Sequence, residues 1–130
     1  MENRRILVDT SIVIDYLRRQ DRPNTKFVKL FKDNELCLST ISVFELYNGA
    51  TSEGKRMDIE TLCNNIEIID FDINTAKIAS EIYRDLRLKN KLIEFRDILI
   101  SSTAIQHNLP VAPLNIKHFE RIDNLHLISL

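Results

Sequence analysis

Hydrophobic residues follow two periods that alternate along the chain. Short apolar runs rich in β-branched residues predict strands, and apolar residues spaced three or four apart predict helices. The first run, residues 5–8, is followed at once by a helical stripe at Val13, Tyr16 and Leu17. The remaining predicted strands are residues 35–39, 66–69, 109–113 and 125–128. Regular alternation of strands and helices favours an α/β fold with a mostly parallel sheet covered on both faces.

The predicted helices differ in how much of their surface is apolar. A helix from about Asn74 to Lys89 has one apolar stripe, as expected for a helix with one solvent face. A helix that Asp97 opens and that runs to about Gln106 is apolar on most sides and should be nearly buried. Further helices are expected after a cap at Asn24 or Thr25, from about Ser42 to Gly49, and over residues 55–64.

Length and composition predict one compact domain over residues 1–130. The chain has 44% apolar and 28% charged residues, close to globular averages, and no linker, repeat or low-complexity segment. It shows neither a membrane-spanning apolar run nor a signal-peptide pattern. Its two cysteines, Cys37 and Cys63, lie far apart in apolar segments, which is typical of reduced buried thiols. We therefore expect a cytoplasmic protein without membrane contact.

The charge balance and the glycine content restrict the function classes. A net charge of -1 argues against a domain that holds nucleic acid by bulk positive charge, but it permits a nuclease whose acidic site offsets a basic rim. The only glycines are Gly49 and Gly54, so the sequence contains neither a P-loop nor a dinucleotide-binding fingerprint.

Three acids fall at informative places: Asp9 ends the first strand, Glu45 lies in an apolar segment, and Asp97 opens the buried helix. Each also has a purely structural interpretation, as a helix N-cap, as a capping-box partner of Ser42 and as a helix-dipole acid respectively. A parallel sheet, however, gathers strand ends and helix starts along one edge. Acids that converge there repel one another and need a counter-charge. A divalent cation supplies one, and oxygen-only ligation suits Mg²⁺ or Mn²⁺.

The motifs resemble those of PIN domains, specifically VapC-type toxins of type II toxin–antitoxin pairs. The resemblance covers essentially the whole chain and rests on LVDTS at residues 7–11, STISVFEL at 39–46, DILISSTA at 97–104 and LNIKHFER at 114–121. It implies a three-layer α/β/α sandwich with a mostly parallel central sheet. It also implies a Mg²⁺-dependent endoribonuclease.

Carried over residue by residue, the resemblance implies that Asp9 and Asp97 bind the metal and that Glu45 is the third acid of the motif. The family's fourth position, often Asp and in many members Asn, falls on Asn115. An amide brings no charge, so we expect one tightly held metal. Pro113 replaces a hydroxyl residue commonly found two positions earlier, which weakens this corner further. Glu120 lies one turn on and could compensate, although a solvent-exposed helical acid is the simpler interpretation.

The expected chemistry is in-line attack of a metal-activated water on an RNA phosphodiester. Glu45 would ligate the metal or orient the water, while Thr10 and Ser11 would hydrogen-bond to carboxylates or phosphate. The basic residues expected to contact substrate are Arg18, Arg19, Arg22, Lys55, Arg56 and Arg96. No catalytic role is expected for the histidines, which show no metal-ligand spacing: His107, His118 and His126.

The resemblance further implies a homodimer and a small antitoxin that wraps the surface. Apolar residues of the early helices are available for an antitoxin groove, unless they pack in the core: Tyr16, Phe27, Phe31, Tyr47 and Met57. One alternative is a catalytically weak PIN-fold module that binds RNA or protein, since Asn115 and Pro113 depart from the pattern. A receiver-like signalling domain is another, but Lys117 lacks the strand context that this class requires after a phosphorylatable acid such as Asp70.

Overall fold

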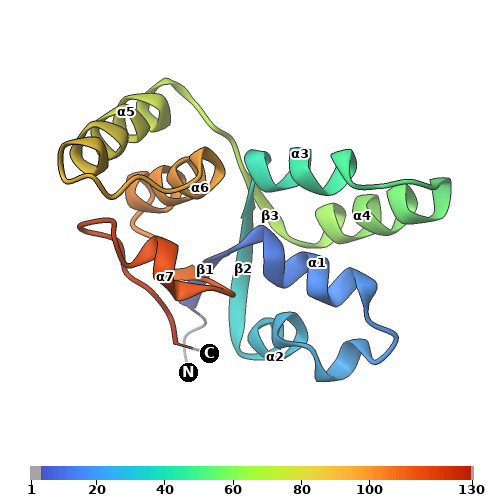
Figure 1. Ribbon diagram of the computed structural model, residues 1–130. Helices are drawn as coiled ribbons and strands as arrows, with labels where there is room; N and C mark the ends of the chain where they lie inside the picture. Colours follow the sequence, from blue (N-terminus) through green and yellow to red (C-terminus); the bar gives the residue numbers. More distant parts are fainter. Residues whose placement is uncertain (1–3, 130) are drawn as a thin grey trace.

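The computed structural model describes residues 4–129, in which strands and helices alternate (Figure 1). The strands are β1 (Arg4–Val8), β2 (Asn34–Ser39), β3 (Glu67–Ile69) and β4 (Val111–Ala112). The helices are α1 (Thr10–Arg18), η1 (Arg22–Asn24), α2 (Lys26–Asp33), α3 (Thr40–Asn48), α4 (Glu53–Asn65), α5 (Ile73–Leu88), α6 (Phe95–Gln106) and α7 (Ile116–Phe119).

The four strands form one parallel sheet in the order β3-β2-β1-β4. Leu7 of β1 is in register with Cys37 of β2 on one side and with Val111 of β4 on the other. All four strands therefore end at the same edge of the sheet. The predicted parallel α/β fold is confirmed, and the first helical residue after β1, Thr10, comes only two positions beyond the strand.

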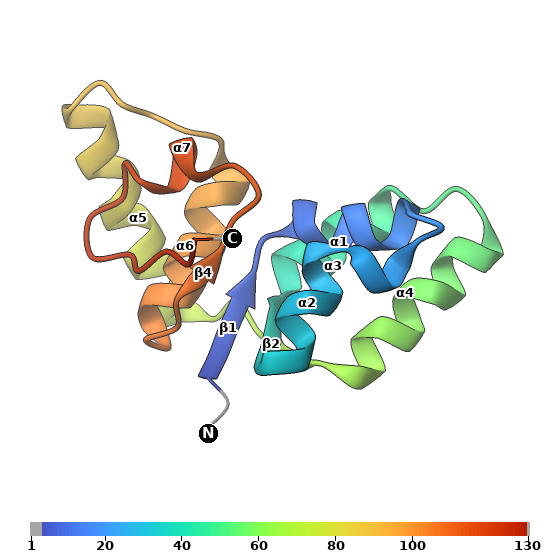
Figure 2. The ribbon, with the colours of Figure 1, turned by 90° about the horizontal axis from the view of Figure 1, so that it is seen from below.

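Alternate residues of each strand pack against the two helical layers. Ile6 and Val8 of β1 belong to the core beneath α1 to α4, whereas Leu7 faces the core beneath α6 and α7. The two layers lie on opposite sides of the sheet in both views (Figures 1 and 2). Because strand residues buried between two layers must be apolar at consecutive positions, Ile6, Leu7 and Val8 of β1 are all apolar. The result is the expected three-layer α/β/α sandwich.

The prediction of a fifth strand at residues 125–128 is wrong. Only Leu127 pairs with the sheet, through an isolated parallel bridge to Val111. The physical reason lies in β4, which is two residues long and is bracketed by Pro110 and Pro113. On the side that faces Leu127, Pro113 has no backbone N–H for the next ladder bond, and the Leu109 amide donates instead to the Ala104 carbonyl at 2.9 Å.

Two helix boundaries also differ from the prediction. The helix α6 begins at Phe95, so Asp97 is its third residue and not its first. The helix α3 begins at Thr40 because the Ser39 hydroxyl caps it by accepting a hydrogen bond from the Ser42 amide at 3.1 Å. Glu45 consequently lies in the middle of α3 and takes no part in a capping box.

The cysteines and the helix lengths bear on the remaining expectations. Cys37 is buried in β2, Cys63 is half-buried in α4, and both are free thiols. Burial, followed by the charge of Glu67, raises the pKa of Cys37 to about 11, so this thiol stays protonated at neutral pH. Within residues 4–129, none of the helices combines the length and the apolar character needed to cross a membrane.

Candidate active site

Asp9 and Asp97 lie together at the edge where the strands end. Asp9 follows β1 and is the N-cap of α1, and Asp97 is in the first turn of α6. Each residue is only 3% exposed. The Asp9 carboxylate accepts hydrogen bonds from the backbone amides of Ser11 at 3.5 Å and of Leu114 at 3.4 Å. Both distances are at the long limit for N–H···O bonds, so the carboxylate is only weakly compensated by its own chain.

The environment of Asp9 disfavours its ionised form. Burial raises the pKa of the Asp9 carboxyl above its ordinary value, and the negative charge of Asp97 raises it further. The Leu114 and Ser11 amides and the charge of Arg96 act in the opposite direction without cancelling the rise. A carboxylate pair with this electrostatic strain attracts a cation, because a positive charge between the two acids relieves both burial and repulsion.

Glu45 reaches the same edge from α3. The hydroxyl of Thr10, which is fully buried, lies 2.9 Å from Glu45 Oε1 and 2.7 Å from Ser42 Oγ. The Ser42 hydroxyl also lies within hydrogen-bond range of the Ser39 hydroxyl. A chain of buried hydroxyl groups therefore holds the Glu45 carboxylate in place. The predicted contact of Thr10 with a site carboxylate is present.

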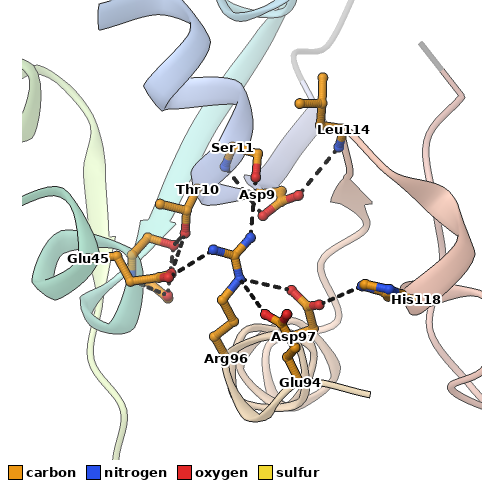
Figure 3. Close-up of polar contacts among 11 residues, drawn as sticks. Asp9, Thr10, Ser11, Glu45, Glu94, Arg96, Asp97, Leu114 and His118 are labelled. Atoms are coloured by element: carbon orange, nitrogen blue, oxygen red, sulfur yellow. Dashed lines mark hydrogen bonds and ion pairs between the residues drawn. The ribbon is translucent and has the colours of Figure 1, made fainter. Parts of the chain in front are cut away.

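The Arg96 guanidinium lies between these acids (Figure 3). Its Nη1 donates to Glu45 Oε2 at 3.0 Å, and its Nη2 donates to Ser11 Oγ at 3.3 Å. Its Nε lies 3.5 Å from Asp97 Oδ1. Burial lowers the pKa of Arg96, but attraction by Glu45, Asp97 and Asp9 outweighs burial and leaves this pKa raised. The sequence predicted that a metal ion would balance the negative charge of the acids. Arg96 balances part of this charge.

His118 of α7 is a member of the site for which no role was predicted. Its Nδ1 lies 3.1 Å from Asp97 Oδ2, and its side chain is 41% exposed (Figure 3). The two residues are 21 positions apart and belong to different helices, so no spacing rule joins them. The only available signal was the resemblance of the segment at residues 114–121, in which His118 lies.

Asn115, the predicted fourth corner, is exposed and acts as the N-cap of α7. Its Oδ1 accepts a hydrogen bond from the Lys117 amide at 3.1 Å. Within residues 4–129 no side-chain hydrogen bond joins Asn115 to Asp9, Glu45 or Asp97. The neighbouring residue Leu114 does contact Asp9 through its amide. A catalytic role for Asn115 stays a prediction, as do the roles of the three acids.

The donor set suits a hard divalent cation held by few protein ligands. Throughout residues 4–129, no group of three or more His, Cys, Asp or Glu side chains is arranged to hold a metal ion by itself. Two buried carboxylates, Asp9 and Asp97, do share one edge. Mg²⁺ in proteins usually takes one or two carboxylates and completes its octahedral shell with water and substrate phosphate. The pair fits that mode and does not fit a closed structural site.

Comparison with known proteins assigns the chain to a family. The PIN domain model matches residues 6–125. The chain belongs to the PIN domain family. The match begins within β1 and includes all three acids and α7, so the PIN domain includes every residue of the site. The resemblance of the sequence motifs is thereby confirmed.

Curated relatives of this PIN domain carry ribonuclease names. It is 31% identical over 126 residues to Ribonuclease VapC1 of Methanocaldococcus jannaschii, an alignment that covers 97% of this chain and 87% of the relative. It is 32% identical over 122 residues to Ribonuclease VapC2 of Haemophilus influenzae, covering 89% of this chain and 90% of the relative.

Solved PIN-domain structures share the fold over almost the whole chain. A VapBC2 structure from Rickettsia felis, bound to a promoter DNA fragment, contains a chain with a TM-score of 0.83 and 27% identity. That alignment covers 97% of this chain and 98% of the other. The FitAcB structure from Neisseria gonorrhoeae gives a TM-score of 0.80 at 27% identity, covering 95% and 96% of the two chains.

Proposed function

We propose that this chain is a metal-dependent endoribonuclease and the toxin component of a toxin–antitoxin pair. The observation that carries the proposal is the buried pair of Asp9 and Asp97 at the edge where the strands end, in which Asp9 accepts only two long backbone hydrogen bonds. Curated relatives over almost the full chain are named ribonucleases, which supports the reaction class. Structural neighbours are described as VapBC assemblies, which supports the toxin role.

The proposed cofactor is one Mg²⁺ ion, with Mn²⁺ as a substitute. Asp9 and Asp97 would hold it, because they are the most buried acids of the cluster and already strain one another. When bound, such a cation supplies Lewis-acid activation of water and of the phosphodiester, together with neutralisation of developing charge. Asn115 brings no charge, and it is occupied as the cap of α7, which favours a single ion.

The chain's own residues would then orient the reactants. Glu45 is held in place by Thr10 and Arg96, so its carboxylate can orient the attacking water by accepting a hydrogen bond from it. Ser11 offers a half-buried hydroxyl at the mouth of the site, suitable for a phosphate oxygen. In-line attack on the phosphorus places the leaving oxygen on the opposite side.

The decisive experiment is incubation of the purified chain with total cellular RNA and Mg²⁺, followed by mapping of the cleaved ends. We expect discrete cleavage sites that disappear with EDTA and return with Mn²⁺. Arg5→Gln serves as a control because this arginine is paired with Glu67 at the beginning of the strands, the end of the sheet opposite the acids. Cleavage that persists in EDTA would refute metal dependence. RNA binding without cleavage under all conditions would favour the alternative of a catalytically weak PIN-fold binding module.

An antitoxin partner is proposed for the face formed by α1, α2 and α4. A hollow there is lined by aromatic and polar residues, and Phe31 at its edge is 48% exposed. Of the residues predicted to serve an antitoxin groove, Met57 is also exposed, at 60%, whereas Phe27 is buried in the core. A homodimer and a cytoplasmic location remain proposals that rest on the family resemblance. Light scattering of the purified chain tests the homodimer.

A further inference from the structure

Arg96 is an ion-pair partner whose hydrogen-bonding capacity is only partly used. Its Nε is buried and, within the part of the chain that the structure describes, has no hydrogen-bond partner. The nearest acceptors are Asp97 Oδ1 at 3.5 Å and Glu94 Oε2 at 3.7 Å, both beyond normal N–H···O distance. A guanidinium in a purely structural pair normally satisfies its fork of donors. Arg96 is held near Asp97 by charge and not by directed bonds.

Both oxygens of Asp97 already face a nitrogen. Oδ1 faces Arg96 Nε, and Oδ2 faces His118 Nδ1 at 3.1 Å. A cation bound to Asp97 would take a lone pair of Oδ1 or Oδ2 and would then lie close to the nitrogen that faces that oxygen. The contact with Arg96 is the longer and carries the cationic charge, which a second cation repels. The bond from Arg96 Nη1 to Glu45, at 3.0 Å, is the stronger anchor and can persist.

We propose that Arg96 is an exchangeable counter-ion: it holds Asp97 and Glu45 together in the metal-free chain and releases Asp97 when a divalent cation binds. The inference rests on the proposed metal-dependent function and adds a competitor for the metal that is built into the chain. The carboxylates of Asp9, Glu45, Glu94 and Asp97 all lie near one guanidinium, so the metal-free site keeps an excess of negative charge that still attracts a cation. Arg96 thereby sets the metal affinity.

The first test observes the guanidinium directly. In metal-free protein, the buried Arg96 Nε–H should give a resolved resonance in ¹H–¹⁵N spectra, assigned by its loss in Arg96→Lys. Titration with diamagnetic Mg²⁺ should move this resonance and speed its exchange with water, and the shift should saturate together with metal binding. The Arg22 resonance is the internal control and should not move. An Arg96 resonance that is unchanged at saturating Mg²⁺ would overturn the proposal.

The second test measures metal affinity by calorimetric titration with Mn²⁺. Arg96→Gln should bind Mn²⁺ about tenfold more tightly than wild type, because one competing charge at close range is removed. Arg96→Lys keeps the charge and should stay nearer to wild type. Arg22→Gln is the matched control, because the Arg22 side chain is as exposed as that of Arg96, at 34%. It should match wild type, since Arg22 pairs with Asp58 and not with Asp9 or Asp97. Equal affinity of Arg96→Gln and wild type would refute the counter-ion role.

Stability separates a failure of this inference from a failure of the proposed function. Circular dichroism establishes that each variant is folded, and the melting temperature of metal-free Arg96→Gln should lie below that of wild type. Added Mn²⁺ should raise it by more than it raises wild type. If neither wild type nor Arg96→Gln binds Mn²⁺ at millimolar concentration, the metal-dependent function and the inference fall together. If both bind with equal affinity, only the inference falls.

Discussion

Two arginines of this chain, Arg22 and Arg96, have equally exposed side chains and yet stand in different electrostatic situations. Arg22 meets one acid, Asp58, with a fork of two contacts at 2.5 and 3.3 Å. It also donates to the Leu17 carbonyl at 3.1 Å and lies 4.9 Å above the Tyr16 ring. One positive charge meets one negative charge with good hydrogen-bond geometry. This ion pair therefore links α4 to the segment after α1.

Arg96 lies near four acids, Asp9, Glu45, Glu94 and Asp97, but makes only two hydrogen bonds, at 3.0 and 3.3 Å, whereas Arg22 makes three. Charge and geometry are both unmatched, and the surplus negative charge is buried. Exposure therefore does not distinguish the surroundings of Arg22 from those of Arg96. The balance of charge and the number of N–H groups that find an acceptor do distinguish them. An ion pair whose charges balance stabilises the fold. Buried excess negative charge instead favours binding of a cation.

The largest effect should come from removing a surplus carboxylate. Asp97→Asn should lower RNA cleavage by about 10³-fold or more, because several kcal/mol of charge stabilisation in the transition state depend on the cation that Asp97 would hold. Thermal unfolding should stay cooperative, since the substitution relieves repulsion with Asp9. Cleavage assays in Mg²⁺ and melting curves measure both. Asp58→Asn is the matched control and should reduce stability while cleavage continues; loss of cleavage in both variants would remove the contrast between the two regions.

The balanced pair should respond in stability. Arg22→Gln should lower the free energy of unfolding by about 1–2 kcal/mol, the sum of a half-exposed ion pair and a cation–π contact. For a chain of this length that corresponds to a fall in melting temperature of about 3–6 °C. Differential scanning calorimetry measures it. A melting temperature equal to that of wild type would mean that the short contacts of Arg22 contribute nothing.

The pH dependence of stability should expose the strain at Asp9. Because its folded-state pKa is raised by burial and then by Asp97, the folded chain binds more protons than the unfolded chain between the ordinary Asp value and the raised one. This group therefore makes metal-free protein less stable as pH rises through that window. Asp9→Asn should lack the effect, so its melting temperature should gain on wild type from acid to neutral pH. Parallel curves for the two proteins would contradict the assignment.

The smallest effect is expected at a pair with matched charges but greater exposure. Arg5 donates to Glu67 at 2.6 and 3.2 Å, with side chains that are 40% and 50% exposed. Arg5→Gln should cost only about 0.2–1 kcal/mol, and less at high salt. Urea unfolding in low and high NaCl measures the cost. A loss as large as that of Arg22→Gln would show that exposure does not weaken these pairs.

Much of the fold was predictable because burial on both faces leaves a clear trace. Strands β1 and β2 are apolar at consecutive positions, and the helices between them carry apolar stripes. The failures have local causes. Two prolines around β4 shorten the last part of the sheet, and the short helices η1 and α7 are too brief to show a period. The predicted strand at residues 125–128 kept its apolar character but could not build a ladder.

The convergence of Asp9, Glu45 and Asp97 was predictable because two of them are fixed by the ends of regular elements. The sequence did not predict the contacts of Arg96 with Glu45 or of His118 with Asp97. Arg96 reaches Glu45 across 51 residues, and such contacts depend on side-chain conformations within a finished fold. A basic residue next to an acid in sequence does not reveal which carboxylate it will meet. The catalytic roles themselves remain predictions that the experiments above address.

The position of β4 makes this site a late product of synthesis. The Asp9 amide donates to the Ala112 carbonyl at 3.0 Å, and the Asp9 carboxylate is met by the Leu114 amide. A nascent or prematurely terminated chain that ends before β4 contains all three acids but lacks the backbone that fixes the first of them. In a nuclease, such a fragment should be inert, so activity would require synthesis at least through Leu114.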